Sequence, residues 1–235
     1  MDKINSELGF YFGALILYVV SVVFGCSYLE LFSNPAIIPS IFCFYFISVK
    51  GKINILFTIS FLSYFIGEIL NLISVNDFLI PSLICFIIPY LIVIYFFIQD
   101  FLFYLKKKKN FVFSTSFYIV LLFLIYLLLN MLSFFNMKSG TEFVIYIIYG
   151  VLLFIMGMIV TLIQFNFNNR AIFYMVLMVT SFIVSDLFYI FSIKMTDVIA
   201  LKLISVISQQ ISYFLFVKYF IHRTNFKVNN TTVQI

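Results

Sequence analysis

Two carboxylate side chains, Glu68 and Asp186, lie inside long apolar stretches of this 235-residue chain. An acid in the hydrocarbon of a bilayer costs on the order of a few kcal/mol unless it faces protein, a partner or water, and such residues usually have a function. The acids are 118 positions apart, and each lies 15 residues after the start of its segment, taken as Ile53 and Ala171. At the helical rise of 1.5 Å per residue, both lie about 22 Å along their helices. We therefore expect them to share one depth and to meet.

Small and polar side chains continue from each acid along one face of its predicted helix. Around Glu68 they are spaced i, i+3, i+4, i+7, i+8 and i+11, which is the spacing of a single helical face. The faces comprise Ser60, Ser63, Tyr64, Gly67, Glu68 and Asn71; Ser181, Ser185, Asp186, Tyr189 and Ser192; and, in the last apolar segment, Ser205, Ser208, Gln209 and Ser212. Serines alone would also fit close helix packing, but packing does not require a carboxylate. We expect the three faces to line one internal cavity. Its candidate substrate-binding residues are Tyr64, Asn71, Ser181, Ser185, Tyr189 and Gln209.

Two enclosed acids support general acid and base chemistry. Burial disfavours the charged form of a carboxyl group, and a second carboxylate nearby favours one protonated and one ionised member, which is the arrangement used to donate and accept protons. Serine hydrolases need a histidine beside the serine, and the only histidine, His222, lies at the end of the last apolar segment. Cys26, Cys43 and Cys85 lack metal-binding spacing. We expect no metal, no cofactor, and hydrolysis of an acid-sensitive lipid linkage.

The composition places these helices in a membrane. The chain is 64% hydrophobic and 10% charged, whereas soluble domains carry about 25% charged residues. A spanning helix needs about 20 largely apolar residues, and strands of a membrane β-barrel would alternate in polarity, which these longer runs do not. The sequence predicts an all-α, polytopic membrane protein with one transmembrane domain over residues 1–235. Its eight transmembrane helices are expected at 8–25, 35–49, 53–75, 78–100, 112–134, 143–165, 171–193 and 198–221.

The distribution of basic residues predicts the orientation in the membrane, because cytoplasmic loops carry an excess of Lys and Arg. With a cytoplasmic N-terminus, one side receives 11 of the 14 basic residues: Lys3, Lys50, Lys52, Lys106, Lys107, Lys108, Lys109, Arg170, Lys218, Arg223 and Lys227. The other side receives Lys138, Lys194 and Lys202. We therefore expect both termini in the cytoplasm, membrane lipids as partners, and no nucleic-acid partner for the net charge of +5. The compact form without a sorting signal favours a bacterial inner membrane. The oligomeric state stays open.

A weak internal repeat accompanies the two acids. An offset of 118 residues places Gly67-Glu68 on Ser185-Asp186 and Ser74 on Ser192. Such an offset is typical of two four-helix halves. Because each half has an even number of spans, the second half would begin on the same side of the membrane as the first, and the two halves would be parallel.

Short motifs in the chain resemble those of the YhhN family of lysoplasmalogenase-like membrane proteins, which have eight spans. That family has Lys-Pro-Leu after an N-terminal hairpin, then a helix ending near Gly-Asp, and later a helix with Phe-x-x-Ser-Asp. The corresponding stretches here are Asn34-Pro35-Ala36, Phe65-Ile66-Gly67-Glu68, and Phe182-Ile183-Val184-Ser185-Asp186, with one residue more in the last. Gln209-Gln210 is similar to an Ala-Gln element near the family's C-terminus. The resemblance spans nearly the whole chain.

The resemblance implies hydrolysis of the vinyl-ether bond of a lysophospholipid substrate, a lysoplasmalogen, to a fatty aldehyde and a glycerophospho-headgroup. It adds Asn34 and Gln210 to the candidate substrate-binding residues and makes Glu68 and Asp186 the catalytic pair. One acid, Asp186, would protonate the vinyl ether while Glu68 orients or deprotonates water, or the two roles are exchanged.

Two other interpretations remain open at this point. Glu68 replaces an aspartate of the family pattern, and Asn34 replaces its lysine, so the chain could be a family member without activity that serves as a membrane interaction protein.

Alternatively, a proton-coupled transporter or lipid-binding protein would use the acids to bind protons or a cationic group. Transporters often break paired helices with Gly or Pro, whereas all four prolines lie in the first half of this chain.

Overall fold

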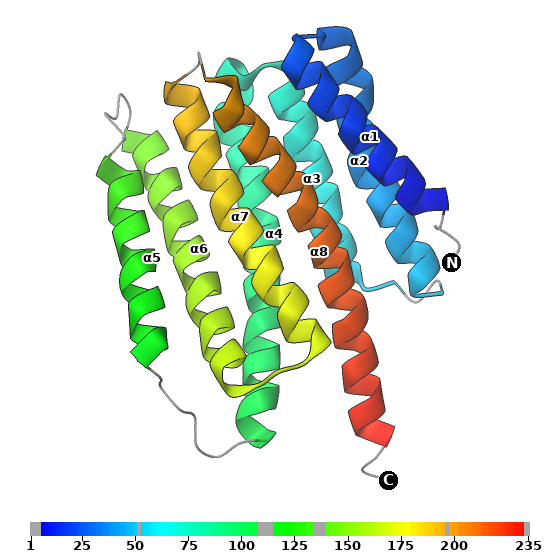
Figure 1. Ribbon diagram of the computed structural model, residues 1–235, viewed down its shortest axis with the longest axis vertical. Coiled ribbons are helices and arrows are strands. Elements are labelled where there is room, and N and C mark those ends of the chain that lie inside the picture. Colours follow the sequence, from blue (N-terminus) through cyan, green and yellow to red (C-terminus); the bar gives the residue numbers. More distant parts are fainter. Residues whose placement is uncertain (1–5, 51–52, 108–114, 134–139, 196–197, 233–235) are drawn as a thin grey trace.

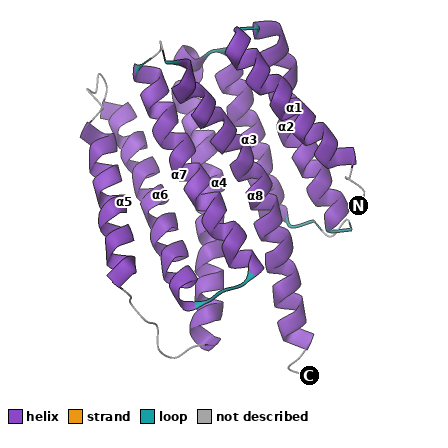
Figure 2. Cartoon of the chain, viewed as in Figure 1, coloured by secondary structure: helices purple, strands orange, loops and turns teal. Residues whose placement is uncertain are grey.

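The computed structural model is a bundle of α-helices (Figure 1) and describes residues 6–50, 53–107, 115–133, 140–195 and 198–232. Within these ranges the regular structure is entirely helical (Figure 2). The helices are α1 (Ser6–Phe24), α2 (Ser27–Ser48), α3 (Ile55–Ile73), α4 (Val75–Lys107), α5 (Thr115–Ser133), α6 (Gly140–Asn166), α7 (Arg170–Lys194) and α8 (Ile199–Thr232). The predicted all-α class is thus confirmed. Lys3, Lys52, Lys108, Lys109 and Lys138, used above to predict orientation, lie outside the described residues.

Seven of these helices are long and apolar enough to cross a membrane, and the chain therefore has the architecture of a polytopic membrane protein. The exception is α5, whose apolar stretch Thr115–Asn130 is shorter. Large apolar side chains on the outside of the bundle, such as Phe10, Leu62 and Ile119, are exposed. Such a surface fits hydrocarbon rather than water.

Three helices differ clearly from their predicted bounds, and the last of them, α8, continues to Thr232, 11 residues beyond the predicted end at residue 221. The second helix begins at Ser27, eight residues before the predicted start at Pro35, and continues through Pro35 and Pro39. Its first turns carry Glu30 and Asn34, whose polarity ended the apolar run on which the prediction depended. Membrane helices tolerate proline where neighbouring groups satisfy the freed backbone. The fourth helix extends to Lys107 and is kinked at Phe78, where φ is −111° and ψ is 15°.

The chain reverses direction from each helix to the next, so α1 begins and α8 ends on the same side of the bundle (Figure 1). The helices that carry the two acids each pack on the helix that follows them, α3 on α4 and α7 on α8. Contacts of α8 with α1 and α2, and of α4 with α6, join the two ends of the sequence into one bundle. At the outer edges lie α5 on one side and α1 with α2 on the other (Figure 1).

Aromatic rings fill the core between the acid-bearing helices. The Phe61 ring of α3 stacks on Phe216 of α8 with a centroid distance of 5.6 Å. One turn further along α3, Tyr64 stacks on Phe182 of α7 at 6.1 Å and contacts Tyr213 of α8 at 4.7 Å. Such ring pairs are worth about 0.5–1.5 kcal/mol each beyond the area they bury. They fix the polar face of α3 toward α7 and α8.

A third buried acid, which the apolar pattern did not single out, joins α4 to α8. Both oxygens of Asp100 accept hydrogen bonds from Arg223 Nε, at 2.8 and 2.9 Å, and Oδ2 also accepts from the Tyr219 hydroxyl at 2.6 Å. The Arg223 Nη2 group donates to Gln99 Oε1 at 2.7 Å. The side chains of Asp100 and Arg223 are only 8% and 9% exposed. This closed cluster fastens one end of α8 to α4.

The ion pair gives a first prediction about stability. Replacing Arg223 by Met leaves the Asp100 charge buried without its cation, which typically costs about 3–5 kcal/mol. We expect Arg223→Met to lower the thermal unfolding temperature in detergent, measured by circular dichroism. The double variant Asp100→Leu with Arg223→Met removes both charges and is expected to recover most of the loss. A single variant as stable as the unchanged chain would contradict this role.

A second prediction concerns the contact between α3 and α4 next to Glu68. A Cβ atom added to Gly67 would lie 2.8 Å from Cε1 of the buried Phe86 ring. Overpacking of this kind costs about 1–3 kcal/mol, so Gly67→Ala should lower the unfolding temperature. The matched control is Gly13→Ala in α1, where nothing lies within 4 Å of the added methyl group and a helical alanine should be neutral or mildly stabilising. Equal unfolding temperatures for the two variants would count against a tight Gly67 contact.

Candidate functional site

Glu68 faces the interior of the bundle, as its polar helix face predicts, and is 6% exposed. The helix α3 begins directly after Asn54, whose side chain caps it by accepting a hydrogen bond from the Phe57 backbone N–H at 3.0 Å. Glu68 Oε1 accepts hydrogen bonds from Gln209 Nε2 at 2.8 Å and from the Tyr213 hydroxyl at 2.9 Å. Both donors come from α8, so side chains of this helix hold Glu68 in place.

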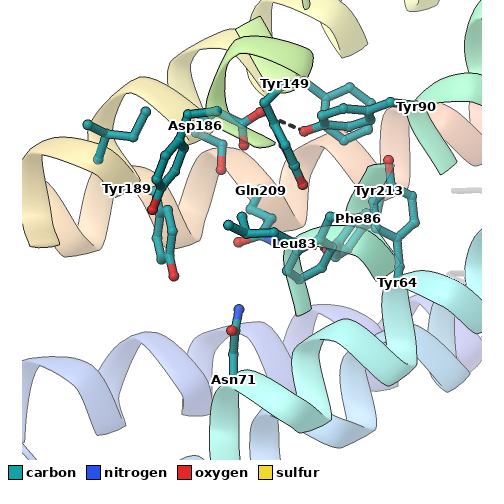
Figure 3. Close-up of a pocket in the computed structure, with 14 residues that line it drawn as sticks. Tyr64, Asn71, Leu83, Phe86, Tyr90, Tyr149, Asp186, Tyr189, Gln209 and Tyr213 are labelled. Carbon is teal, nitrogen blue, oxygen red and sulfur yellow. Dashed lines mark hydrogen bonds between the residues drawn. The ribbon is translucent and has the colours of Figure 1, made fainter. Parts of the chain in front are cut away.

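Asp186 also faces inward, and its main partner comes from α4. The Asn169 side chain caps α7 by accepting from the Ile172 backbone N–H at 2.9 Å, and Asp186 follows more than four turns later. The Tyr90 hydroxyl donates to Asp186 Oδ2 at 2.7 Å (Figure 3). The Tyr90 ring lies edge-on to Tyr149 and to Phe182, at centroid distances of 5.3 and 5.2 Å. Asp186 is thus enclosed by aromatic groups, with one carboxyl oxygen held by a phenol.

The two acids line adjoining cavities, which we name by their acid. The Asp186 cavity has a volume of about 40 Å³ and is lined by Tyr64, Asn71, Leu83, Phe86, Tyr90, Tyr146, Tyr149, Phe182, Ser185, Asp186, Tyr189, Ile190, Gln209 and Tyr213. The Glu68 cavity has a volume of about 220 Å³ and is lined by Tyr18, Glu30, Asn34, Glu68, Asn71, Leu72, Tyr189, Ser192, Lys202, Ser205, Val206 and Gln209. The three polar faces therefore line two adjoining cavities rather than the single one expected.

Three residues belong to both cavities and join them: Asn71, Tyr189 and Gln209. In Figure 3, Asn71 projects from α3 toward the space that Tyr189 of α7 and Gln209 of α8 face. Gln209 Nε2 donates both to Glu68 and, at 3.0 Å, to the Tyr213 hydroxyl. Because Tyr213 lines the Asp186 cavity, this amide connects the hydrogen bonds of one cavity with the wall of the other.

Several buried polar atoms at these cavities have no hydrogen-bond partner in the part of the chain that the structure describes. They are the Tyr64 hydroxyl, which lines the Asp186 cavity, Asn34 Oδ1, which lines the Glu68 cavity, and Asn71 Oδ1, which lines both. More than 90% of buried polar groups in proteins are satisfied by protein or water. An orphan group beside a polar space is a place for water or a ligand. These unpartnered atoms could therefore form hydrogen bonds with a ligand or with water bound in the cavities.

Most of the residues predicted for the site line one or both cavities, and two do not. Ser181 is half-buried on α7, one turn before Ser185, and lines neither cavity. Gln210 is fully buried but faces away from both, and its backbone oxygen accepts a hydrogen bond from the Tyr11 hydroxyl. Of the adjacent glutamines, Gln209 is the one at the cavities, because successive helical residues point about 100° apart.

Other residues at the cavities were missed by the sequence pattern. Tyr213 lies four residues after Gln209 and could have been found by extending the polar face of α8 by one turn. Tyr90 and Tyr149 lie on helices that carry no acid in their central turns, so nothing in their spacing distinguishes them from other core aromatics. Glu30 and Lys202 lie near the ends of their helices, where charged residues usually need no special explanation.

The polar side-chain groups that line the two cavities are carboxylates, amides, hydroxyls and one ammonium group. In the described ranges, no group of three or more His, Cys, Asp or Glu residues is placed to hold a metal ion. Comparison of the chain with protein families, with curated proteins and with solved structures found no match.

Proposed function

We propose that this chain is an intramembrane hydrolase that cleaves the vinyl-ether bond of lysoplasmalogens. The observation that carries the proposal is the placement of a buried carboxylate, Glu68, and a half-buried one, Asp186, on adjoining cavities joined by Gln209. Neither acid forms an ion pair within the described residues, so neither is neutralised by a structural cation. The motif resemblance to the YhhN family, which includes the same two acids, points to the same chemistry.

The different linings of the cavities suggest how a lysolipid lies in the site. Leu83, Phe86 and Phe182 line the Asp186 cavity among its tyrosines, which suits the carbons of the vinyl ether itself. Glu30 and Lys202 line the Glu68 cavity, which suits the polar head. With the head in the Glu68 cavity, the vinyl β-carbon lies nearer Asp186, and the glycerol oxygen lies nearer Glu68.

This orientation assigns the roles that the sequence left open. Asp186 Oδ2 accepts from Tyr90, and the structure gives no hydrogen bond to Oδ1 among the described residues, so Oδ1 is suited to carry the proton. Glu68 Oε1 already accepts two hydrogen bonds, which suits an ionised base. Asp186 is therefore the general acid and Glu68 the general base.

The reaction then consumes one water. The C=C electron pair takes the proton of Asp186 at the β-carbon and leaves an oxocarbenium ion at the α-carbon and the ether oxygen. Water adds to the α-carbon while Glu68 takes a proton from it, which gives a hemiacetal. The hemiacetal hydroxyl returns its proton to Asp186 as the C–O bond to glycerol breaks, and the glycerol oxygen receives the proton from Glu68. The products are an aldehyde and a glycerophospho-headgroup, and both acids regain their starting states.

The proposal places all eight helices across a bacterial inner membrane with both termini in the cytoplasm, as two parallel halves. Several contacts support the halves: α1 with α2 corresponds to α5 with α6, α3 with α4 to α7 with α8, and α2 with α8 to α6 with α4. Asn71 and Tyr189 share the 118-residue offset of the acids and lie at the junction of the cavities.

The carboxylate mechanism is tested by neutral isosteres of each acid. Glu68→Gln and Asp186→Asn should each lower aldehyde release from a vinyl-ether lysophospholipid by at least about 10²-fold, because acid or base catalysis typically contributes 10²–10⁴-fold. The assay uses detergent-purified protein without added metal. Glu7→Gln, which changes an acid in the first turn of α1, is the matched control. Full activity in both site variants, with unfolding temperatures unchanged, would exclude this mechanism.

The contact of Tyr90 with the general acid gives a separate prediction. Tyr90→Phe keeps the ring against Tyr149 and Phe182 and removes only the donor to Asp186. We expect kcat to fall about tenfold with little change in KM, because this hydrogen bond stabilises the charge that develops on Asp186 as it gives up its proton, and a hydrogen bond to a charged group is worth about 1.5–3 kcal/mol. Tyr95→Phe, an exposed tyrosine of the same helix, serves as the control. A rise in KM with kcat unchanged would show that Tyr90 binds substrate and does not position the acid.

A further inference from the structure

A further cavity lies against a different face of α7 from the one that carries Asp186. It has a volume of about 390 Å³ and is enclosed by α5, α6 and α7, and we call it the α5 cavity. None of the residues that line it also lines the Asp186 cavity or the Glu68 cavity. Its wall on α7 consists of Val176, Val179, Thr180, Ile183, Val184 and Leu187. A molecule bound there would therefore not occupy the space between the two acids.

The lining of the α5 cavity is hydrocarbon apart from three residues, Thr161, Gln164 and Thr180. Both threonine hydroxyls donate to backbone carbonyls of their own helices, at 2.6 Å for Thr161 and 2.9 Å for Thr180. A buried water needs two to four polar partners, whereas an apolar cavity of about 150 Å³ stays dry and binds benzene. The α5 cavity is larger, so the ligand that matches it is a hydrocarbon.

Glycines on α6 account for the position of α5 at the edge of the bundle (Figure 1). A Cβ atom added to Gly157 would lie 2.8 Å from Cδ1 of Leu124, and one added to Gly150 would collide with Leu128. Small residues of this kind let two membrane helices approach closely. Among the described residues, α6 is the main contact of α5. The close contact with α6 thus leaves the space between α5 and α7 open.

The first half of the chain has a corresponding groove between α2 and α3, with a volume of about 230 Å³. The 118-residue offset of the two acids carries six of its seven lining residues onto residues that line the α5 cavity. In order, Pro39, Phe42, Thr58, Phe61, Leu62 and Phe65 correspond to Gly157, Val160, Val176, Val179, Thr180 and Ile183. The two spaces are therefore equivalent positions of the internal repeat.

The two equivalent spaces differ in how far side chains fill them. In the first half, the rings of Phe42 and Phe61 lie against each other with a centroid distance of 6.1 Å. Valine takes both places in the second half, at Val160 and Val179. Protein interiors contain few voids larger than a water molecule, and the first half shows that rings fit this part of the fold. The smaller side chains of the second half leave room for a ligand.

The length of the α5 cavity matches one leaflet of a bilayer. Its wall on α7 extends from Val176 to Leu187, which is about 16 Å at the helical rise, and half of the hydrocarbon core is about 15 Å. Its end at Gln164 is close to the end of α6 at Asn166. The next helix begins there with the exposed Arg170, a cation suited to the phosphate of a lipid headgroup.

We propose that the α5 cavity binds one acyl chain of a membrane phospholipid, whose headgroup lies at the membrane surface beside Arg170. The acyl chain fills the space between α5 and α7 and joins the outermost helix of the second half to the bundle. This lipid is a structural ligand and not a substrate, so the proposal does not rest on the hydrolase activity.

The test is native mass spectrometry of the full-length protein, purified and delipidated in detergent and then titrated with dioleoyl phosphatidylglycerol. The unchanged chain should bind one lipid, and the lipid should raise its unfolding temperature. Val160→Phe with Val179→Phe introduces the rings of the first half and should weaken binding at least about tenfold, a difference of about 1.4 kcal/mol. The lipid-dependent rise in unfolding temperature should disappear as well. Val184→Phe changes a half-buried residue of the same wall and should act in the same direction, even if the double variant does not fold.

Two sets of controls locate the lipid. Ile119→Phe with Leu122→Phe adds the same rings at exposed positions of α5 that do not line the cavity, and binding should not change. Glu68→Gln and Asp186→Asn should also bind the lipid as the unchanged chain does, because neither acid lines the α5 cavity.

Three outcomes would overturn the proposal. Equal binding of several lipids by the unchanged chain and by all the phenylalanine variants would show only nonspecific lipid around the bundle. Loss of the lipid in Glu68→Gln or Asp186→Asn would place it between the acids. A dimer without bound lipid, lost in the Val160 and Val179 variant, would make a second copy of the chain the occupant. Because none of these readouts is aldehyde release, the lipid site and the hydrolase can fail separately.

Discussion

Hydrogen bonding of acids inside an apolar bundle is the constraint on which this structure depends. Three buried or half-buried carboxylates accept a hydrogen bond from a tyrosine of another helix: Glu68 from Tyr213, Asp186 from Tyr90, and Asp100 from Tyr219. A tyrosine can serve in this way because its ring packs as an apolar body while its hydroxyl reaches a polar partner. The 16 tyrosines of the chain thus combine core packing with the placement of acids.

The three acids differ in what completes their surroundings. Asp100 is also paired with Arg223, which is itself held by Gln99, and the result is a closed structural cluster. Glu68 and Asp186 have only neutral donors among the described residues and open onto cavities. An ion pair neutralises a buried charge at the cost of its reactivity, whereas neutral donors leave the carboxyl group able to exchange a proton. This difference, rather than burial alone, separates the acids proposed for catalysis from the one that holds α4 to α8.

The sequence predicted those features that a single helix determines. The inward direction of Glu68 and Asp186 and the positions of Asn71, Ser185 and Tyr189 at the cavities follow from spacing along one helical face. Features that need two helices were not predictable in this way. The donors Tyr90 and Tyr213, the placement of Glu30 and Lys202 at one cavity and the division into two cavities depend on how helices distant in sequence pack together. The early start of α2 was missed because its polar first turns contain Glu30 and Asn34, and an apolar run cannot indicate a helix that lines a cavity.

The shared residue Gln209 has a consequence for how a long molecule could occupy the site. Its amide lies at the junction of the two cavities and at the same time donates to Glu68. A lysolipid that extends through both spaces has to push this side chain aside, and the Glu68 oxygen then loses one of its two donors. Occupation of the junction and loss of the Gln209–Glu68 hydrogen bond would then occur together. A ligand short enough to fit within one cavity would leave this hydrogen bond intact.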